Sequence, residues 1–163
     1  MEKENKIRVI LVGMDESEEG IHALLWTLCH LCTEKDRLII IHAQPTASSK
    51  AKGLALYSLV SFVALDTLKI FEEDIKRSTR KLFATAMEKC TEKHVVPETR
   101  AVNGDAKGVL CNAMKDYNAD VLVLGSHGNR PIKRLLFGSV SEHCVRHAHC
   151  PVIVVKNQKS RAH

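Results

Sequence analysis

The sequence has few aromatic residues, a small excess of charge and no long apolar run, and each feature excludes a class of function. Aromatic residues make up 4% of the 163 residues, so the chain offers no stacking surface for single-stranded nucleic acid. Lys and Arg number 24 against 19 Asp and Glu, a net charge of +5, which suits an anionic ligand but does not by itself indicate nucleic-acid binding. No apolar run approaches the roughly 20 residues of a transmembrane helix, so we expect neither a nucleic-acid nor a membrane partner.

The amino terminus lacks the apolar stretch of a secretory signal peptide. It reads Met-Glu-Lys-Glu-Asn-Lys, from which we expect a cytoplasmic protein. The six cysteines are then expected to be free thiols, because the cytosol keeps thiols reduced. The chain does have an ordinary globular composition, 45% hydrophobic and 26% charged residues, which predicts a single domain over residues 1–163 with its core in about residues 6–157.

Short β-branched, apolar runs alternate along the chain with helical patterns. The predicted strands are residues 7–12, 37–43, 99–102, 120–124 and 152–155. Apolar residues at helical spacing predict helices from about residue 15 to 32, from about 59 to 93, and over 107–117 and 138–147. Asp15 and Glu18 have the spacing of a capping box for the first of these. The alternation predicts a doubly wound α/β fold with a five-stranded parallel sheet in the order 3-2-1-4-5.

Two loops that follow predicted strands are rich in small and polar residues. One is Gly13–Ser17, after the first strand, and the other begins at Gly125–Gly128, after the fourth. In a doubly wound sheet the ligand crevice lies beyond the carboxyl ends of the strands, where the strand order reverses. The order 3-2-1-4-5 makes strands 1 and 4 neighbours, so both loops are expected at that crevice.

The second loop has chemistry suited to phosphate. Gly125 and Gly128 permit close approach of a ligand to the backbone and a positive φ. Gly138 and Ser139 open a helix, whose free N–H groups and dipole attract anions. Positive charge between them comes from Arg130, Lys133 and Arg134.

Each of these residues also has a simpler explanation. Ser139 and Glu142 have the spacing of a capping box, Gly125 could end a strand, and the basic residues could form a solvated face. Their occurrence together at one expected crevice is what favours a ligand.

The pattern Gly125-x2-Gly128-x9-Gly138-Ser139 resembles the nucleotide-binding motif of the ATP-binding universal stress proteins. The match includes the preceding apolar strand and the following helix and Val-rich strand, and the resemblance extends over essentially the whole chain. Other features that fit the family pattern are Asp15, Ser17 and Ile41–Ala43. The resemblance implies a Rossmann-type fold of the adenine nucleotide alpha hydrolase-like kind, and as ligand ATP (or ADP or AMP), with Mg²⁺ carried by the phosphates.

The resemblance also implies roles for individual residues. Gly13, Met14 and Asp15 would border the adenosine, with Asp15 near ribose, phosphates or metal, and Ala43 would meet adenine through its backbone. The ribose and α-phosphate would be lined by Gly125, Ser126, His127 and Gly128. The outer phosphates would be held by Arg130 and by the N–H groups of Ser139, Val140 and Ser141, with the two serine hydroxyls. The remaining expected contacts are Leu124, Asn129, Pro131 and Gly138. Many family members carry proline or another residue in place of Gly13, which is expected to loosen that turn.

The function expected from this reading is a nucleotide-sensing module of the stress response with at most slow hydrolysis, and the resemblance implies a homodimer through strand 151–155. A nucleotide hydrolase or adenylyl-transfer enzyme on the same fold remains open, although the chain has no Walker lysine after Gly128 and no kinase-type catalytic loop. A flavodoxin-like electron carrier is disfavoured because neither site loop contains Trp or Tyr.

Two histidine and cysteine clusters are weaker candidates. His143 and His147 lie at i, i+4 and could share a metal, but Cys144 is expected to face the core, so no structural metal is predicted. The C-x-x-C pair Cys29 and Cys32 lies late in a helix, which favours core packing over redox chemistry.

Overall fold

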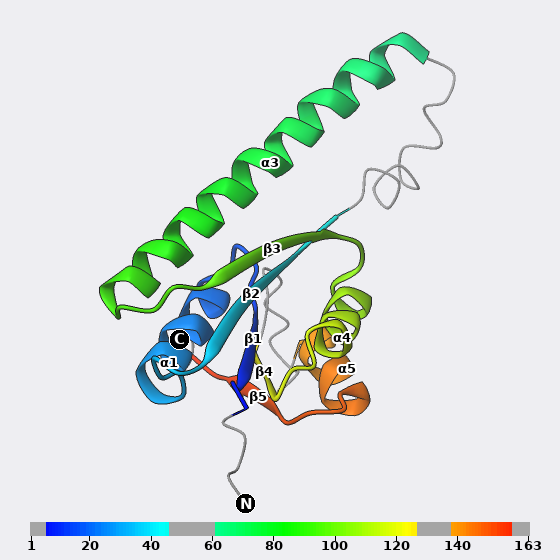
Figure 1. The fold of residues 1–163 in the computed structure, drawn as a ribbon. Coiled ribbons are helices and arrows are strands. Elements are labelled where there is room, and N and C mark those ends of the chain that lie inside the picture. Colours follow the sequence, from blue (N-terminus) through cyan, green and yellow to red (C-terminus); the bar gives the residue numbers. More distant parts are fainter. Residues whose placement is uncertain (1–5, 46–60, 127–137, 158–163) are drawn as a thin grey trace, which may run out of the picture.

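Five parallel strands form one sheet with helices on both faces (Figure 1). This computed structural model describes residues 6–45, 61–126 and 138–157, with the side chains of the long helix described from residue 69. The strands are β1 (Val9–Gly13), β2 (Arg37–Gln44), β3 (Glu98–Asn103), β4 (Val121–Gly125) and β5 (Val152–Val155). The helices are α1 (Glu18–His30), α3 (Ser61–Glu92), α4 (Ala106–Asp116) and α5 (Ser139–His147). The sheet order is β3-β2-β1-β4-β5 and all four pairings are parallel, which confirms the predicted fold class and strand order.

The core lies in two layers, one on each face of the sheet. Successive side chains of a strand point to opposite faces, so Ile10 and Val12 of β1 pack under α1 and α3. Val9 and Leu11 of the same strand pack under α4 and α5. Strands β1 and β4 carry no polar side chain, because neither of their faces is exposed to water.

Helix α1 begins two residues later than the predicted capping box would place it. Its N-cap is Ser17, whose hydroxyl accepts a hydrogen bond from the Gly20 N–H at 3.2 Å. The predicted cap at Asp15 and Glu18 is wrong, because the Asp15 carboxylate instead accepts a hydrogen bond from the Ser17 N–H at 3.1 Å. Asp15 therefore organises the turn that leads into α1, and Ser17 caps the helix.

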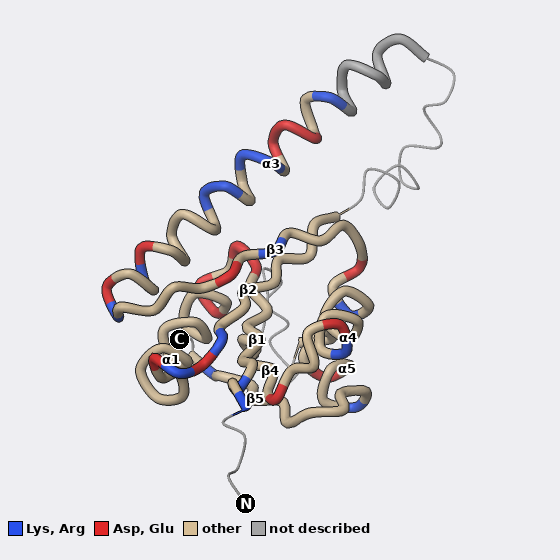
Figure 2. The backbone as a smooth tube through the Cα atoms, in the orientation of Figure 1, with Lys and Arg blue, Asp and Glu red and all other residues tan. Residues whose placement is uncertain are grey.

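Helix α3 extends well beyond the sheet, as Figure 1 shows. From Thr79 to its end the helix buries Thr79, Leu82, Ala86 and Cys90 against the sheet. Its described side chains before that point, from residue 69, are mostly exposed, and acidic and basic residues are interspersed along this part of the helix (Figure 2). None of the helices in the described residues is both long and apolar enough to cross a membrane.

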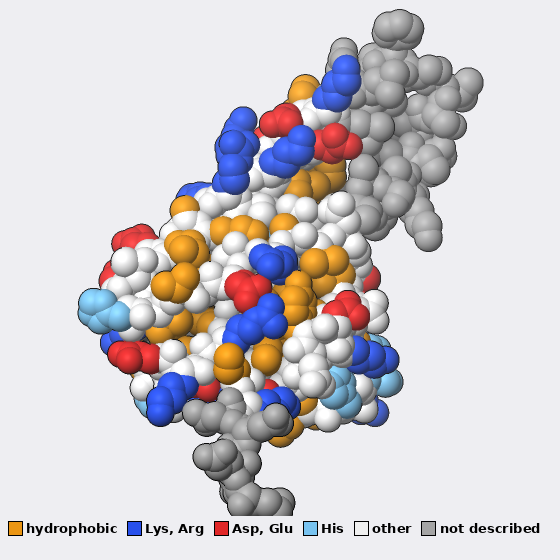
Figure 3. Space-filling model, in the orientation of Figure 1, with side chains coloured by type: hydrophobic (Ala, Val, Ile, Leu, Met, Phe, Trp, Pro, Cys, Tyr) orange, Lys and Arg blue, Asp and Glu red, His pale blue; other side chains and the backbone are white. Residues whose placement is uncertain are grey.

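The two edges of the sheet differ in polarity. Edge strand β3 carries a charged cluster in which Glu98 pairs with Arg37 at 2.5 Å and with Arg100 at 2.9 Å, and charged side chains lie over this part of the surface (Figure 3). Edge strand β5 reads Val-Ile-Val-Val, with Val152, Ile153 and Val154 half-buried. Charge protects an edge against pairing with another chain, and an apolar edge lacks that protection.

Candidate functional site

The loops that follow β1 and β4 leave the sheet side by side. The two strands pair directly, with Gly13 opposite Leu124. The loop containing Met14 and Asp15 and the loop that starts at Gly125 therefore begin at the same carboxyl edge of the sheet, where the strand order reverses. The predicted convergence of these two segments is confirmed.

Gly13 ends β1 inside the core and is not part of a loosened turn. Its backbone is buried, and the Met14 N–H that follows it donates to the Ile41 carbonyl at 2.9 Å. A Cβ at Gly13 would collide with the Leu124 side chain and lie 3.0 Å from that of Leu110. The absence of a side chain at this position is thus explained by close packing against α4 and β4.

Asp15 is half-buried and held in a fixed orientation. Its Oδ1 accepts hydrogen bonds from both the N–H and the hydroxyl of Ser17. Within the described part of the chain its Oδ2 makes no hydrogen bond. Gly20 lets this carboxylate approach α1, since a Cβ there would lie 2.9 Å from Oδ1. One carboxylate oxygen is therefore available at the carboxyl edge of β1.

His42 is a buried polar residue of this region whose role the sequence pattern did not reveal. Its Nδ1 lies 3.0 Å from the Met14 carbonyl oxygen, and because a carbonyl only accepts, Nδ1 carries the proton. Its ring meets the edge of Phe83 on α3, with centroids 6.3 Å apart. The only sequence signal is a histidine within an apolar strand. His42 fixes the Met14 backbone next to the half-buried Ala43.

Helix α3 is tied to the same edge of the sheet by two polar contacts. Gln44 at the end of β2 donates to the Thr79 hydroxyl at 2.7 Å, and Ser78 donates to the Glu16 carboxylate. These contacts place α3 beside the segment from Met14 to Glu16. Sequence periodicity could not predict them, because they join residues more than thirty positions apart.

Gly125 has a different role from the one its sequence context suggests. Among the described glycines a positive φ occurs at Gly104 (149°) and not at Gly125, so the expectation of a positive φ at Gly125 is wrong. A Cβ at Gly125 would lie 2.9 Å from the backbone carbon and oxygen of Glu19. Gly125 thus allows β4 to pack against α1, and Leu124 beside it is buried on the opposite face.

The end of β4 is bonded to the start of α5. The Ser126 carbonyl accepts from the Gly138 N–H at 2.7 Å, and the Ser126 N–H donates to the Val155 carbonyl at 2.9 Å. Ser141 is buried, and its hydroxyl donates to the Gly138 carbonyl at 2.9 Å. These bonds bring Ser126 and the first turn of α5 together, as the Gly125–Ser141 pattern predicts.

Helix α5 begins without a side-chain cap. Its N-cap is Gly138, and no side chain in the described residues accepts from its first N–H groups. The alternative capping box of Ser139 and Glu142 is wrong, because Ser139 already lies inside the helix and Glu142 pairs with Arg146 at 2.9 Å. Within the described chain the N–H groups of Ser139, Val140 and Ser141 are thus the uncapped amino end of a helix, where unpaired donors and the helix dipole attract negative charge.

The remaining predicted contacts lie outside the described residues. They are His127, Gly128, Asn129, Arg130 and Pro131, and the basic residues Lys133 and Arg134 lie there too.

The cysteines singled out from the sequence differ in burial. Cys144 is fully buried, and burial raises the pKa of its thiol to about 12, which confirms the prediction that it faces the core. Cys32 is half-buried, and desolvation raises the pKa of its thiol. Cys29 is exposed, so the prediction of core packing is wrong for that residue. Among the residues placed by the structure, no three His, Cys, Asp or Glu side chains are grouped to hold a metal.

Comparison with known proteins settles the family. The model of the universal stress protein family matches residues 6–156. This chain belongs to the universal stress protein family. A curated relative, the universal stress protein YxiE of Bacillus subtilis, is 29% identical over 153 residues, which cover 93% of this chain and 99% of the relative.

Solved structures share the fold. The structure of MJ0577, a universal stress protein of Methanocaldococcus jannaschii, has a TM-score of 0.77 at 19% identity and covers 93% of this chain and 96% of its own. A family member from Arabidopsis thaliana with AMP bound has a TM-score of 0.66 at 22% identity, with 95% of both chains covered. Universal stress proteins in complex with cAMP and, from Archaeoglobus fulgidus, with dAMP have TM-scores of 0.59 and 0.64 at 22% and 13% identity. The first covers 91% of this chain and 95% of its own, and the second 92% and 98%.

Proposed function

We propose that this chain binds an adenine nucleotide at the carboxyl edge of β1 and β4 and acts as a nucleotide-sensing module of the stress response. The observation that carries the proposal is the uncapped start of α5 held against the end of β4. The Gly138 N–H is bonded to Ser126, and the first N–H groups of α5 lack a side-chain partner in the described chain. An anion at this position would satisfy those donors and gain from the helix dipole.

The polar groups near this start suit the parts of a nucleotide. The phosphates would contact the N–H groups of Ser139, Val140 and Ser141 and the exposed Ser139 hydroxyl. The Ser141 hydroxyl, which is buried and donates to Gly138, would hold the turn in shape. The adenosine would lie along the segment from Met14 to Asp15 and against Ala43. The relatives solved with AMP, cAMP and dAMP support an adenine nucleotide as the ligand class.

The residues present also fit a magnesium ion carried by the phosphates. Mg²⁺ is commonly held in proteins by one or two carboxylates together with phosphate oxygens and water. Asp15 offers one carboxylate oxygen, Oδ2, because Ser17 occupies the other. When bound, the ion would neutralise phosphate charge, while Asp15 would orient it from the β1 side.

Calorimetric titration with ATP, ADP and AMP tests the nucleotide proposal. Gly138→Asp places a negative charge at the anion site and is expected to abolish binding, while Ser139→Ala is expected to weaken it by about tenfold, corresponding to the loss of one hydrogen bond to a charged group. Gly128→Val, at the motif glycine, is expected to abolish binding as well. Circular dichroism must show that each variant is folded. If Gly138→Asp and Gly128→Val both bind ATP as tightly as the parent, the site assignment is wrong.

Turnover measurements separate the sensing role from an enzyme. We expect at most slow hydrolysis of ATP, with or without magnesium, because the described residues around Asp15 and Ser139 include no paired base and nucleophile. Rapid, magnesium-dependent release of phosphate or pyrophosphate would instead support a hydrolase or adenylyl-transfer enzyme.

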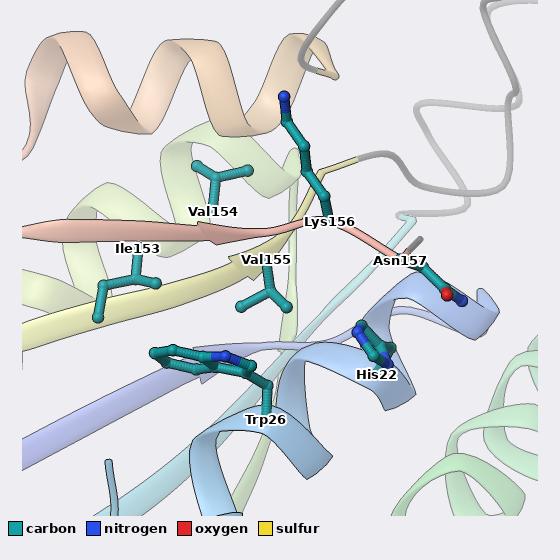
Figure 4. A pocket seen from close by; sticks show the side chains of 7 residues that line it. All are labelled: His22, Trp26, Ile153, Val154, Val155, Lys156 and Asn157. Carbon is teal, nitrogen blue, oxygen red and sulfur yellow. The ribbon is translucent and has the colours of Figure 1, made fainter. Parts of the chain in front are cut away.

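We further propose that two copies of the chain pair through β5. This strand is an edge of the sheet, it is apolar, and it borders a hollow of about 590 Å³ between β5 and α1. Figure 4 shows Ile153 and Val155 pointing toward Trp26, while Val154 points to the other side of the strand. A two-fold dimer would cover this edge with the same residues from each copy.

Light scattering tests the dimer, and the structure selects the variants. Ile153 packs against the core under α1, so Ile153→Lys would also damage the fold. Val154 is half-buried and belongs to neither core layer, so Val154→Lys is expected to give a folded monomer. Val102→Lys on the opposite edge, where Val102 is 39% exposed, is the matched control and should leave the dimer intact. A monomeric parent at micromolar concentration would refute the pairing.

A further inference from the structure

Two histidines lie one above the other on α5. His143 and His147 are one helical turn apart, and their rings stack with centroids 4.1 Å apart and planes inclined by 24°. His143 is half-buried and His147 is exposed. Neither is among the residues assigned to the nucleotide. We propose that His143 and His147 form a two-histidine site for a divalent late transition-metal ion of the Zn²⁺, Ni²⁺ or Cu²⁺ class.

The hydrogen bond of His147 prepares its ring for a metal. Nδ1 of His147 lies 2.8 Å from the His143 carbonyl oxygen. A carbonyl only accepts, so Nδ1 carries the proton and the lone pair of the neutral ring is on Nε2. Histidines that bind metals usually donate their other ring N–H to a carboxylate or a backbone carbonyl, which fixes the tautomer and the ring orientation. His147 already has this arrangement in the helix.

The spacing of the two rings is compatible with a shared ion. Two imidazole nitrogens that each bind one ion at about 2.0–2.1 Å lie about 3 Å apart, and the ring centroids are already 4.1 Å apart. The ring planes are inclined by only 24°, so the in-plane lone pairs do not converge on one ion, and the rings must turn toward each other to share it. The exposure of His147 leaves room for that rotation without a change in the helix.

The surroundings of the pair determine which kind of site it is. The described residues supply no third metal ligand here, and the neighbouring Glu142 is paired with Arg146 at 2.9 Å. The ion would therefore keep water on its other positions and exchange readily. A pair of imidazoles favours Cu²⁺ over Ni²⁺ and Zn²⁺ and all three over Mg²⁺ or Ca²⁺. The segment also lacks the glutamate that follows the first histidine in H-E-x-x-H metalloproteases, so we infer binding of an ion and no hydrolysis.

The site is independent of the proposed nucleotide function, and its test uses nucleotide-free protein and the metal salts alone. Calorimetric titration with ZnCl₂ and NiCl₂ is expected to show one site per chain. His143→Ala and His147→Ala should each weaken binding at least tenfold, since either change leaves a single imidazole. His149→Ala, two residues beyond the helical pair and also exposed, is the matched control and should bind as the parent does. The double variant His143→Ala, His147→Ala measures the background from the other histidines.

A second measurement identifies the ligands directly. Electron paramagnetic resonance of the Cu²⁺-loaded protein should show hyperfine coupling to two nitrogens, falling to one in either single variant, and circular dichroism should show an unchanged helix content. Equal Zn²⁺ affinity of the parent and the double variant would overturn the proposal. So would a loss in His149→Ala as large as that in His147→Ala.

Discussion

Replacement of Gly125 by alanine tests whether this glycine serves packing. The added Cβ would lie 2.9 Å from the carbonyl carbon and oxygen of Glu19 and 3.0 Å from its Cβ. Carbon atoms that are not bonded normally keep about 3.5–4.0 Å apart. The first two contacts are with backbone atoms of α1, so rotation of a side chain cannot relieve them.

The magnitude follows from this overlap. Either α1 moves away from β4 or the end of β4 is distorted, and insertion of an extra carbon into a packed interior costs about 1–3 kcal/mol. For a chain of this size a loss of about 2 kcal/mol lowers Tm by about 4–8 °C. We expect Gly125→Ala to show that loss in thermal and urea unfolding of the nucleotide-free protein.

The chain offers a matched control in Gly108. This glycine is exposed inside α4, and a Cβ there would have no atom within 4 Å. Gly108 lies in the first turn of α4, and because alanine is preferred over glycine in helices, Gly108→Ala should raise stability by at most about 0.5–1 kcal/mol. If Gly125→Ala is as stable as the parent while Gly108→Ala behaves as expected, the packing explanation for Gly125 is refuted.

Two further predictions concern titrating groups. Asp36 accepts two hydrogen bonds from the Arg8 guanidinium, at 2.9 and 2.7 Å, and these hold the pKa of Asp36 below its usual value. A carboxylate with a depressed pKa stabilises the fold above the ordinary carboxyl pKa of about 3.9, and this stabilisation is lost as pH falls through the folded-state pKa. Asp36→Asn should therefore lower the free energy of unfolding in urea by about 1–2 kcal/mol at pH 7. The difference between variant and parent should shrink progressively below about pH 4. Burial raises the pKa of the Cys90 thiol to about 11 and that of Cys144 to about 12. A thiol reagent at pH 8 should therefore label the exposed Cys29 in the native protein and reach Cys90 and Cys144 only after denaturation. Rapid labelling of Cys144 in the native protein would contradict its placement in the core.

The architecture could be predicted from the sequence because its signals are local and repeated. Each central strand is a short β-branched run, and each helix carries an apolar stripe, so the order of elements follows from hydrophobic period alone. Right-handed crossovers then leave few sheet topologies. The convergence of the Asp15 and Gly125 segments follows from that topology alone, because β1 and β4 are neighbours in it.

The contacts of individual residues could not be predicted in the same way. Asp15 and Glu18 have capping-box spacing, yet Ser17 caps α1, because the Asp15 carboxylate bonds to Ser17 instead. Ser139 and Glu142 have the same spacing, yet the N-cap of α5 is Gly138 and Ser139 is already its first helical residue. A capping-box pattern indicates which residues could form the capping hydrogen bonds. The residue at which the helix begins is decided by tertiary packing. The bond from His42 to the Met14 carbonyl spans 28 positions and leaves no periodic signal.

The observed contacts change which residues support a ligand site. In the sequence, the glycines at the strand ends and the serine after Gly138 indicate a ligand only by occurring together. Gly13 and Gly125 are now accounted for by contacts with leucine side chains and with the α1 backbone, so neither requires a ligand to explain it. Ser139, in contrast, is not explained by a capping role, because Gly138 is the N-cap of α5. The feature that favours an anion is therefore the uncapped first turn of α5. Substitutions at Gly138 and Ser139 test the proposed function, whereas substitution of Gly125 tests the fold.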